Sequence, residues 1–175
     1  MREKKFKNVT MNHLVANLAA IIPVTILLPA IFAFTRLYGE VSVETVNPFL
    51  LSLAAILVLP AGFIHELIHE AGWLISGKKH FDFIIGVKLP LCMWIQFKGT
   101  MFGWQLAIGT VLPFVALTII PTIIALVFGN VYILMFAFTH ALGCGADLLM
   151  SIRCLRYLKH TCSDTDGEIG FRVLV

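Results

Sequence analysis

Four long apolar runs constrain the fold of this chain more strongly than any other feature of its sequence. An α-helix rises about 1.5 Å per residue, so about 20 consecutive apolar residues are enough to cross the hydrocarbon core of a membrane. Each run reaches that length, and together they use most of the 175 residues. The sequence predicts an all-α polytopic membrane protein, a single domain over residues 1–175, with four transmembrane helices at about 14–37, 49–76, 102–128 and 131–152.

The composition agrees with a protein whose main partner is the lipid bilayer. Hydrophobic residues make up 59% of the chain and charged residues 13%, whereas a typical soluble domain has about 25% charged residues. The basic segment at residues 1–7 resembles the start of a signal peptide, but the apolar run that follows it is too long. We therefore expect a first helix that is retained in the mature protein.

The stretch between the second and third runs is rich in β-branched and aromatic residues. Residues 81–88 and 92–98 flank Leu89-Pro90-Leu91, a pattern typical of two strands joined by a turn. We expect a short cytosolic β-hairpin at about 81–98, between the second and third transmembrane helices.

The positions of lysine and arginine predict the orientation in the membrane, because cytosolic segments are enriched in these residues. With a cytosolic N-terminus, twelve of the 13 basic residues fall on the cytosolic side, within 2–7, 78–98 and 153–172, and Arg36 alone lies outside. We expect a multi-pass protein of the cell membrane with both termini in the cytosol. The same rule accounts for the net charge of +3, so no nucleic-acid partner is expected.

The second apolar run carries His65-Glu66-Leu67-Ile68-His69, a match to the pattern H-E-x-x-H. Residues four apart lie one turn apart on the same face of a helix, so both imidazoles can reach one metal ion. Zinc hydrolases combine two such histidines with a third protein ligand, an open position for water and a carboxylate base, here Glu66. Ionisable side chains are costly in a membrane unless they serve a function. We therefore interpret His65 and His69 as metal ligands.

The fourth apolar run supplies the candidates for the third ligand. Counted back from the basic residue that closes each run, His69 and Asp147 both lie roughly 10 to 15 Å inside the cytosolic boundary. Asp147 is therefore the preferred third ligand, and the alternative is that it pairs with an arginine at the end of its run. His140, on the same face, is the rival ligand or a group that orients a ligand, and Cys144 is expected to serve packing. Glu70 is expected to orient an imidazole or to hold a cationic neighbour.

Taken together, these features resemble a family of zincin-type bacterial membrane peptidases that is related to the site-2 intramembrane zinc metalloproteases. The resemblance rests on residues 65–69, the hairpin, Leu112-Pro113-Phe114 and Gly145-Ala146-Asp147, and it covers about residues 50–158. Site-2 proteases have a glycine after the aspartate, whereas Leu148 stands there in this chain. The match therefore leans toward the zincin-type family.

The resemblance implies Zn²⁺ held by His65, His69 and Asp147, with Glu66 as the catalytic base. We expect a zinc-dependent endopeptidase of the site-2 protease type, whose substrate is a membrane protein or peptide. The expected cleavage position is at or just inside the cytosolic face of the membrane.

The hairpin offers a place to hold a substrate as an added strand, at an exposed edge near residues 83–87 or 93–97. Two alternatives come from other classes of protein. The first is a non-catalytic membrane subunit, either metal-binding or a pseudoprotease. The second is a small proton-coupled transporter that uses His65, Glu66 and Glu70 as a proton relay and binds no metal.

Overall fold

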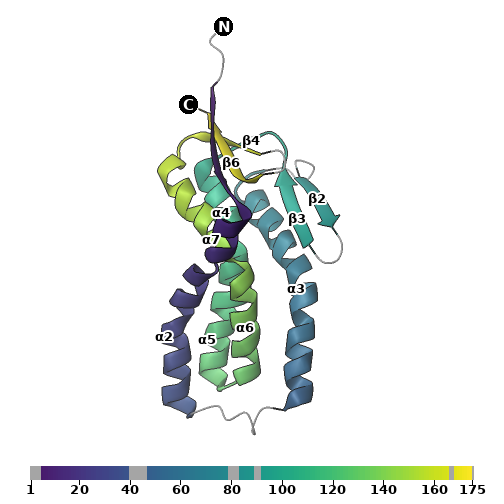
Figure 1. Cartoon of the computed structure of the whole chain (residues 1–175), viewed down its shortest axis with the longest axis vertical. Helices are drawn as coiled ribbons and strands as arrows, with labels where there is room; N and C mark the ends of the chain where they lie inside the picture. The colour runs from purple at the N-terminus through teal and green to yellow at the C-terminus, as the bar shows by residue number, and fades with distance from the viewer. Residues whose placement is uncertain (1–4, 40–46, 79–82, 89–91, 166–167, 175) are drawn as a thin grey trace.

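The computed structural model describes residues 5–39, 47–78, 83–88, 92–165 and 168–174. Its helices run lengthwise beside one another, and a small sheet lies at the end where both chain termini are found (Figure 1). The elements in chain order are β1 (Phe6–Met11), α1 (His13–Leu18), α2 (Ile21–Tyr38), α3 (Pro48–Ile75), β2 (Phe83–Lys88), β3 (Cys92–Phe97), β4 (Thr100–Phe102), α4 (Gly103–Phe114), the π-helical turn η3 (Val115–Ile119), α5 (Ile120–Phe128), α6 (Val131–Gly143), α7 (Gly145–Cys154), the 3-10 turn η4 (Leu155–Tyr157), β5 (Thr161–Asp164) and β6 (Ile169–Leu174).

A four-stranded antiparallel sheet closes one end of the molecule, in the order β1-β6-β5-β4. Its longest pairing sets Phe6 opposite Leu174 and Met11 opposite Ile169, so the first and last strands of the chain are neighbours. The prediction of an all-α protein is therefore wrong. The strands are short, and β1 pairs with β6 and β4 with β5 across long stretches of sequence, so no apolar run predicts them.

Buried and partly exposed side chains alternate along β6, and the buried ones pack against the helices. Phe171 and Val173 have no exposed surface, whereas the residues between and beside them are partly exposed, as a period of two requires for a strand with one buried face. The sheet thus seals a core that also takes side chains from the ends of α3, α4 and α7. This core consists of Trp73, Phe97, Met101, Leu106, Cys154, Cys162, Phe171 and Val173.

The prediction of four transmembrane helices is also wrong. Within the described residues, His13–Tyr38 and Gly103–Phe128 are the two helical segments long and apolar enough to cross a membrane. Val131–Gly143 and Gly145–Tyr157 meet at an angle of 58°. They give a third membrane-crossing segment only if the two are counted together as one broken span. The second apolar run does form one helix, the 28-residue α3, but α3 is not among the segments that meet this criterion in the described part of the chain.

The fourth run is broken because Cys144 stands between two glycines, which are poor helix formers. Gly145 lies against the backbone of residues 19–20, where a Cβ would overlap Ala20, so α7 turns onto the junction of α1 and α2. Gly145 therefore allows the first helical segment to approach α7 closely, whereas a Cβ on Gly143 would meet no atom within 4 Å. The bend places Asp147 in the first turn of α7.

The π-helical turn η3 interrupts the third run. Pro121 follows it and has no backbone N–H, so the carbonyl of Leu117 cannot receive the usual bond from four residues later. Single π-helical turns often accompany functional sites. Here η3 carries Thr118, which has no exposed surface and bonds to a side chain of α6.

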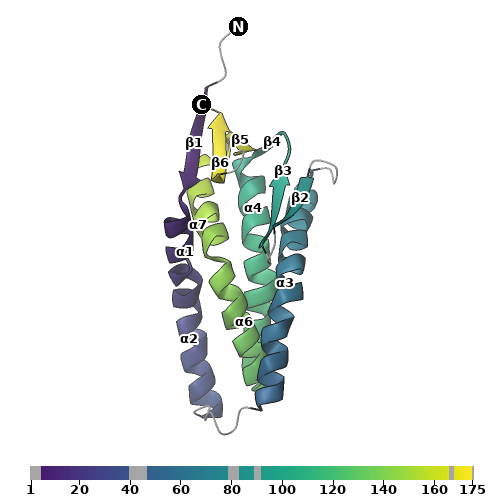
Figure 2. The ribbon, with the colours of Figure 1, turned by 45° about the vertical axis from the view of Figure 1, so that its right-hand side comes forward.

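The predicted hairpin is present between α3 and α4. β2 and β3 pair antiparallel, from Phe83 opposite Phe97 to Lys88 opposite Cys92, and they lie beside the sheet end of α3 (Figure 2). Within the predicted range, residues 81–82 and 89–91 lie outside the described residues. The side of a membrane on which the hairpin and the two chain ends lie stays a prediction.

Candidate metal centre

Helix α3 presents His65 and His69 on one face, as their spacing requires. The two rings meet edge to face with centroids 4.6 Å apart. One further turn along this face, Trp73 stacks on His69 at a centroid distance of 5.8 Å. Trp73 is buried in the core beneath the sheet, so this end of the histidine pair is anchored by packing.

Asp147 reaches the same place from α7. Its Oδ2 lies 3.1 Å from His65 Nε2 and its Oδ1 lies 3.6 Å from His69 Nε2, while the two Nε2 atoms are 3.0 Å apart. The structure thus brings together the three residues that the sequence singled out as ligands, with donor atoms within 4.8 Å of one another.

These distances suit a tetrahedral zinc ion. With zinc–ligand bonds of about 2.0 to 2.1 Å, neighbouring ligand atoms of a regular tetrahedron lie about 3.3 Å apart, and the observed separations of 3.0, 3.1 and 3.6 Å bracket this value. The side chains of His65 and Asp147 keep 13% and 18% of their surface exposed. The donor set therefore fits zinc, and two of its three side chains are not completely buried.

His69 is oriented by a backbone group of α4. Its Nδ1–H donates to the carbonyl of Gly109 at 2.8 Å, which fixes the tautomer that presents Nε2 to a metal. This bond requires α3 and α4 to lie very close together, and a Cβ on Gly72 would stand only 2.8 Å from the Gly109 Cα. The sequence reasoning missed Gly109, although a glycine within an apolar run is a signal for close helix packing.

His65 is oriented from its other side by His140. His65 Nδ1 lies 3.1 Å from His140 Nε2, and His140 Nδ1 lies 2.9 Å from Thr118 Oγ1. With His65 Nε2 turned to a metal, its Nδ1–H donates to His140, whose own Nδ1–H donates to Thr118. The geometry brings His140 against His65, and its role as a group that orients a ligand stays a prediction; Thr118 had no signal in the sequence.

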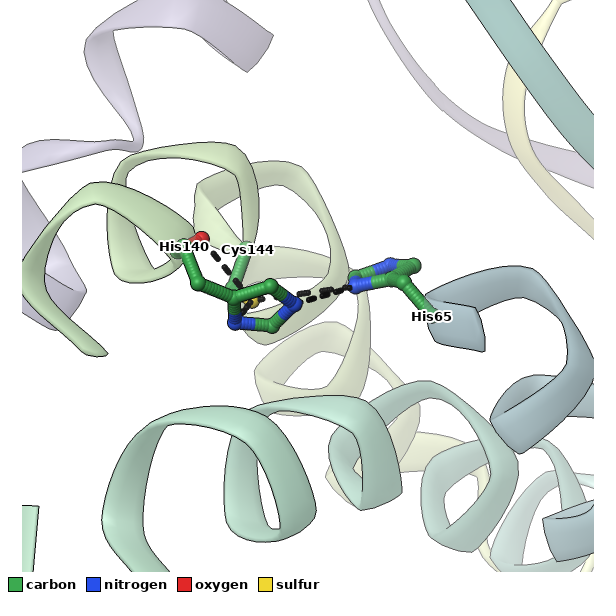
Figure 3. Close-up of side chains that lie close together, drawn as sticks. All are labelled: His65, His140 and Cys144. Atoms are coloured by element: carbon green, nitrogen blue, oxygen red, sulfur yellow. Dashed lines mark hydrogen bonds between the residues drawn. The ribbon is translucent and has the colours of Figure 1, made fainter. Parts of the chain in front are cut away.

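Cys144 lies beside His140 and His65. Its Sγ lies 3.5 Å from His140 Nδ1 and 4.0 Å from His65 Nδ1. Figure 3 shows the three side chains turned toward one another from α3 and from the end of α6. Their donor atoms also lie within 4.8 Å of one another, so the structure holds a second group with metal-ligand spacing.

The two glutamates of the helix lie beside the histidines. Glu66 is half-buried and acts electrostatically on His69, so its carboxylate is placed near the predicted ligands. Glu70 is buried, with 5% of its surface exposed. Their roles as base and as orienting group stay predictions.

Two findings come from comparison with known proteins. A family model described as "Putative zincin peptidase" matches residues 57–162, which is more than half of the chain and includes both histidines and Asp147. Searches among curated proteins and among solved structures found no match to the chain.

Proposed function

The chain belongs to the family described as "Putative zincin peptidase", and from this premise we propose that it is a zinc-dependent endopeptidase of the site-2 type. In this proposal it cleaves a membrane-associated protein or peptide at or just inside the cytosolic face of the membrane. The observation that carries the proposal is the convergence of His65, His69 and Asp147 from two helices at separations that suit one tetrahedral ion.

Each proposed ligand has a chemical reason to bind. The His69 ring is held by the Gly109 carbonyl and the His65 ring by His140, so both present Nε2 to the same point. Asp147 supplies an anionic oxygen that balances part of the ion's charge. Zinc, when bound, supplies a Lewis acid that activates water and polarises the scissile carbonyl.

Glu66 is the proposed general base. It follows His65 directly, is half-buried and lies close enough to His69 to act on it electrostatically. In the proposed reaction Glu66 takes a proton from the attacking water and gives it to the amine that leaves when the peptide bond breaks. The proton count closes, because Glu66 ends the cycle as a carboxylate.

The proposed membrane location rests on exposed apolar side chains as well as on helix length. Soluble proteins rarely show large contiguous apolar surfaces, whereas lipid-facing helices do. Here such side chains are spread over the long helices. They include Ile26, Leu28 and Phe32 on α2, Ile56, Leu57 and Phe63 on α3, and Ile120, Ile123 and Val127 on α5.

The hairpin is the proposed holder of the substrate backbone. Within the described residues β2 and β3 form a sheet of their own, so each strand has one edge that no other strand covers. A substrate segment can add to such an edge through main-chain hydrogen bonds. This requires the segment to be extended, which also exposes its peptide bonds to attack.

Two measurements test the proposal. Purified wild-type protein and a Glu66→Gln variant are compared for zinc content, and membranes from cells that express each are searched for new peptide termini by mass spectrometry. We expect equal zinc content and termini that appear only with the wild type, because the amide cannot take the proton. Termini that persist in Glu66→Gln would refute the mechanism, and zinc without any cleavage would favour the non-catalytic subunit.

The third ligand is tested separately. We expect Asp147→Ala to lose the zinc ion held by His65 and His69, and His140→Ala to bind that ion more weakly, by about 10- to 100-fold, because His140 acts through His65. Full zinc content in Asp147→Ala together with none in His140→Ala would show that the two roles are reversed.

A further inference from the structure

Beside the proposed zinc ligand His65 lie His140 and Cys144, which have no part in the proposed hydrolysis beyond the orientation of His65 by His140. We propose that these three residues form a second metal site, for a thiophilic ion such as Zn²⁺, Cd²⁺ or Cu⁺, which shares the His65 imidazole with the first site. His65 faces the first site with Nε2 and the second with Nδ1, so one ring can serve both.

The two sites are built in similar ways. His140 and Cys144 are four residues apart at the end of α6, as His65 and His69 are on α3, so each pair places two donors on one helix face. The bond from His140 to Thr118 Oγ1, 2.9 Å from Nδ1, leaves the Nε2 lone pair facing His65 Nδ1 at 3.1 Å. Neighbouring nitrogen ligands of a tetrahedral ion lie about 3.3 Å apart.

Charge balance supports a divalent ion in so buried a place. His140 is 6% exposed and Cys144 has no exposed surface, and an uncompensated charge there would be very costly. Binding releases the thiol proton of Cys144 and, when the first site is also filled, the Nδ1 proton of His65. The resulting thiolate and imidazolate carry two negative charges, which cancel those of a divalent ion.

The donor set also indicates which ions bind. A thiolate with imidazoles favours Zn²⁺, Cd²⁺ and Cu⁺ over Mg²⁺ or Ca²⁺. An ion at the second site would take the place of the proton that lies between His65 Nδ1 and His140 Nε2. The hydrogen bond and the ion therefore cannot be present at the same time. The protein therefore has a one-ion state, in which His140 accepts a hydrogen bond, and a two-ion state, in which it is a ligand.

Titration with Cd²⁺ tests the second site without any assay of cleavage. The full chain is purified in detergent, stripped of metal with a chelator and titrated, and bound Cd²⁺ is counted by elemental analysis. The thiolate-to-cadmium absorption band in the ultraviolet is followed in parallel. We expect two Cd²⁺ ions per chain in the wild type, with the band present.

Four variants, one of them a control, identify the residues. Cys144→Ser should bind one Cd²⁺ and lose the band, and His69→Ala should lose the first ion but keep the band. Cys154→Ser is the matched control, since this buried cysteine belongs to the core beneath the sheet, and it should keep both ions and the band. His140→Gln, which should also lose the band, provides a second test if Cys144→Ser does not fold.

One Cd²⁺ per chain in the wild type without the band, or two that remain in Cys144→Ser, would overturn the proposal. The outcome is independent of the proposed function. A protein that cleaves with one ion and has no band would keep the proposed function and lose the second site, whereas two ions without cleavage would do the reverse.

Discussion

The close crossing of α3 and α4 yields a quantitative prediction for Gly72→Ala. A Cβ at this position would stand 2.8 Å from the Gly109 Cα, whereas carbon atoms in contact are about 3.5 to 4.0 Å apart. The obstacle is backbone, so the helices must separate by about 1 Å. The bond from His69 Nδ1 to the Gly109 carbonyl, now 2.8 Å, would then lengthen beyond hydrogen-bonding distance.

The expected result is a loss of zinc affinity of about 10- to 100-fold, the usual effect of removing a partner that orients a ligand. The strain should also lower the free energy of unfolding by about 1 to 3 kcal/mol. Zinc affinity is measured by competition with a chromophoric chelator. Gly62→Ala is the matched control on the same helix, because nothing lies within 4 Å of the added Cβ. Equal affinities in the two variants would refute the link between this crossing and the site.

Three further predictions concern positions outside the ligands. Thr118→Val removes the acceptor of the His140 Nδ1–H at 2.9 Å and should weaken zinc binding about tenfold in the chelator assay, whereas Thr122→Val, whose hydroxyl bonds only to the Thr118 carbonyl among the described contacts, should not. Phe171→Ala, at a side chain with no exposed surface, should cost about 3 to 5 kcal/mol of unfolding free energy, and a loss below about 1 kcal/mol in denaturant titration would contradict the sealed core. Burial raises the pKa of the Cys162 thiol to about 11, so it should resist alkylation at pH 8 in the folded protein, and its contribution to stability should fall as the pH rises from about 9 toward 11.

The part of the site that the sequence could predict is the part that local periodicity determines. His65 and His69 share a face because they are four residues apart on one helix, and Asp147 was predicted to lie near them by comparing depths in two runs. Gly109 and Thr118 belong to a different run, and their roles depend on how closely α4 and η3 approach the histidines. Such distances are set by tertiary packing, which cannot be predicted from a single sequence.

The errors in the fold have the same origin. Apolar length alone could not reveal that Gly145 would turn α7 onto the first helical segment, so a bent pair was taken for one straight helix. The strands of the sheet are short, and β1 and β6 lie at opposite ends of the chain. The hairpin, in contrast, pairs two strands that are consecutive in the sequence, and it was predicted.

The pairing of β1 with β6 has a consequence for the order of events during synthesis. β6 lies between β1 and β5, yet the ribosome makes it after every other described element. Phe171 and Val173 therefore complete the core around Trp73 only when translation has passed them, and Trp73 stacks on His69. A nascent chain thus carries the proposed zinc ligands before the packing that steadies them exists, and premature termination before residue 169 would leave β1 without its partner.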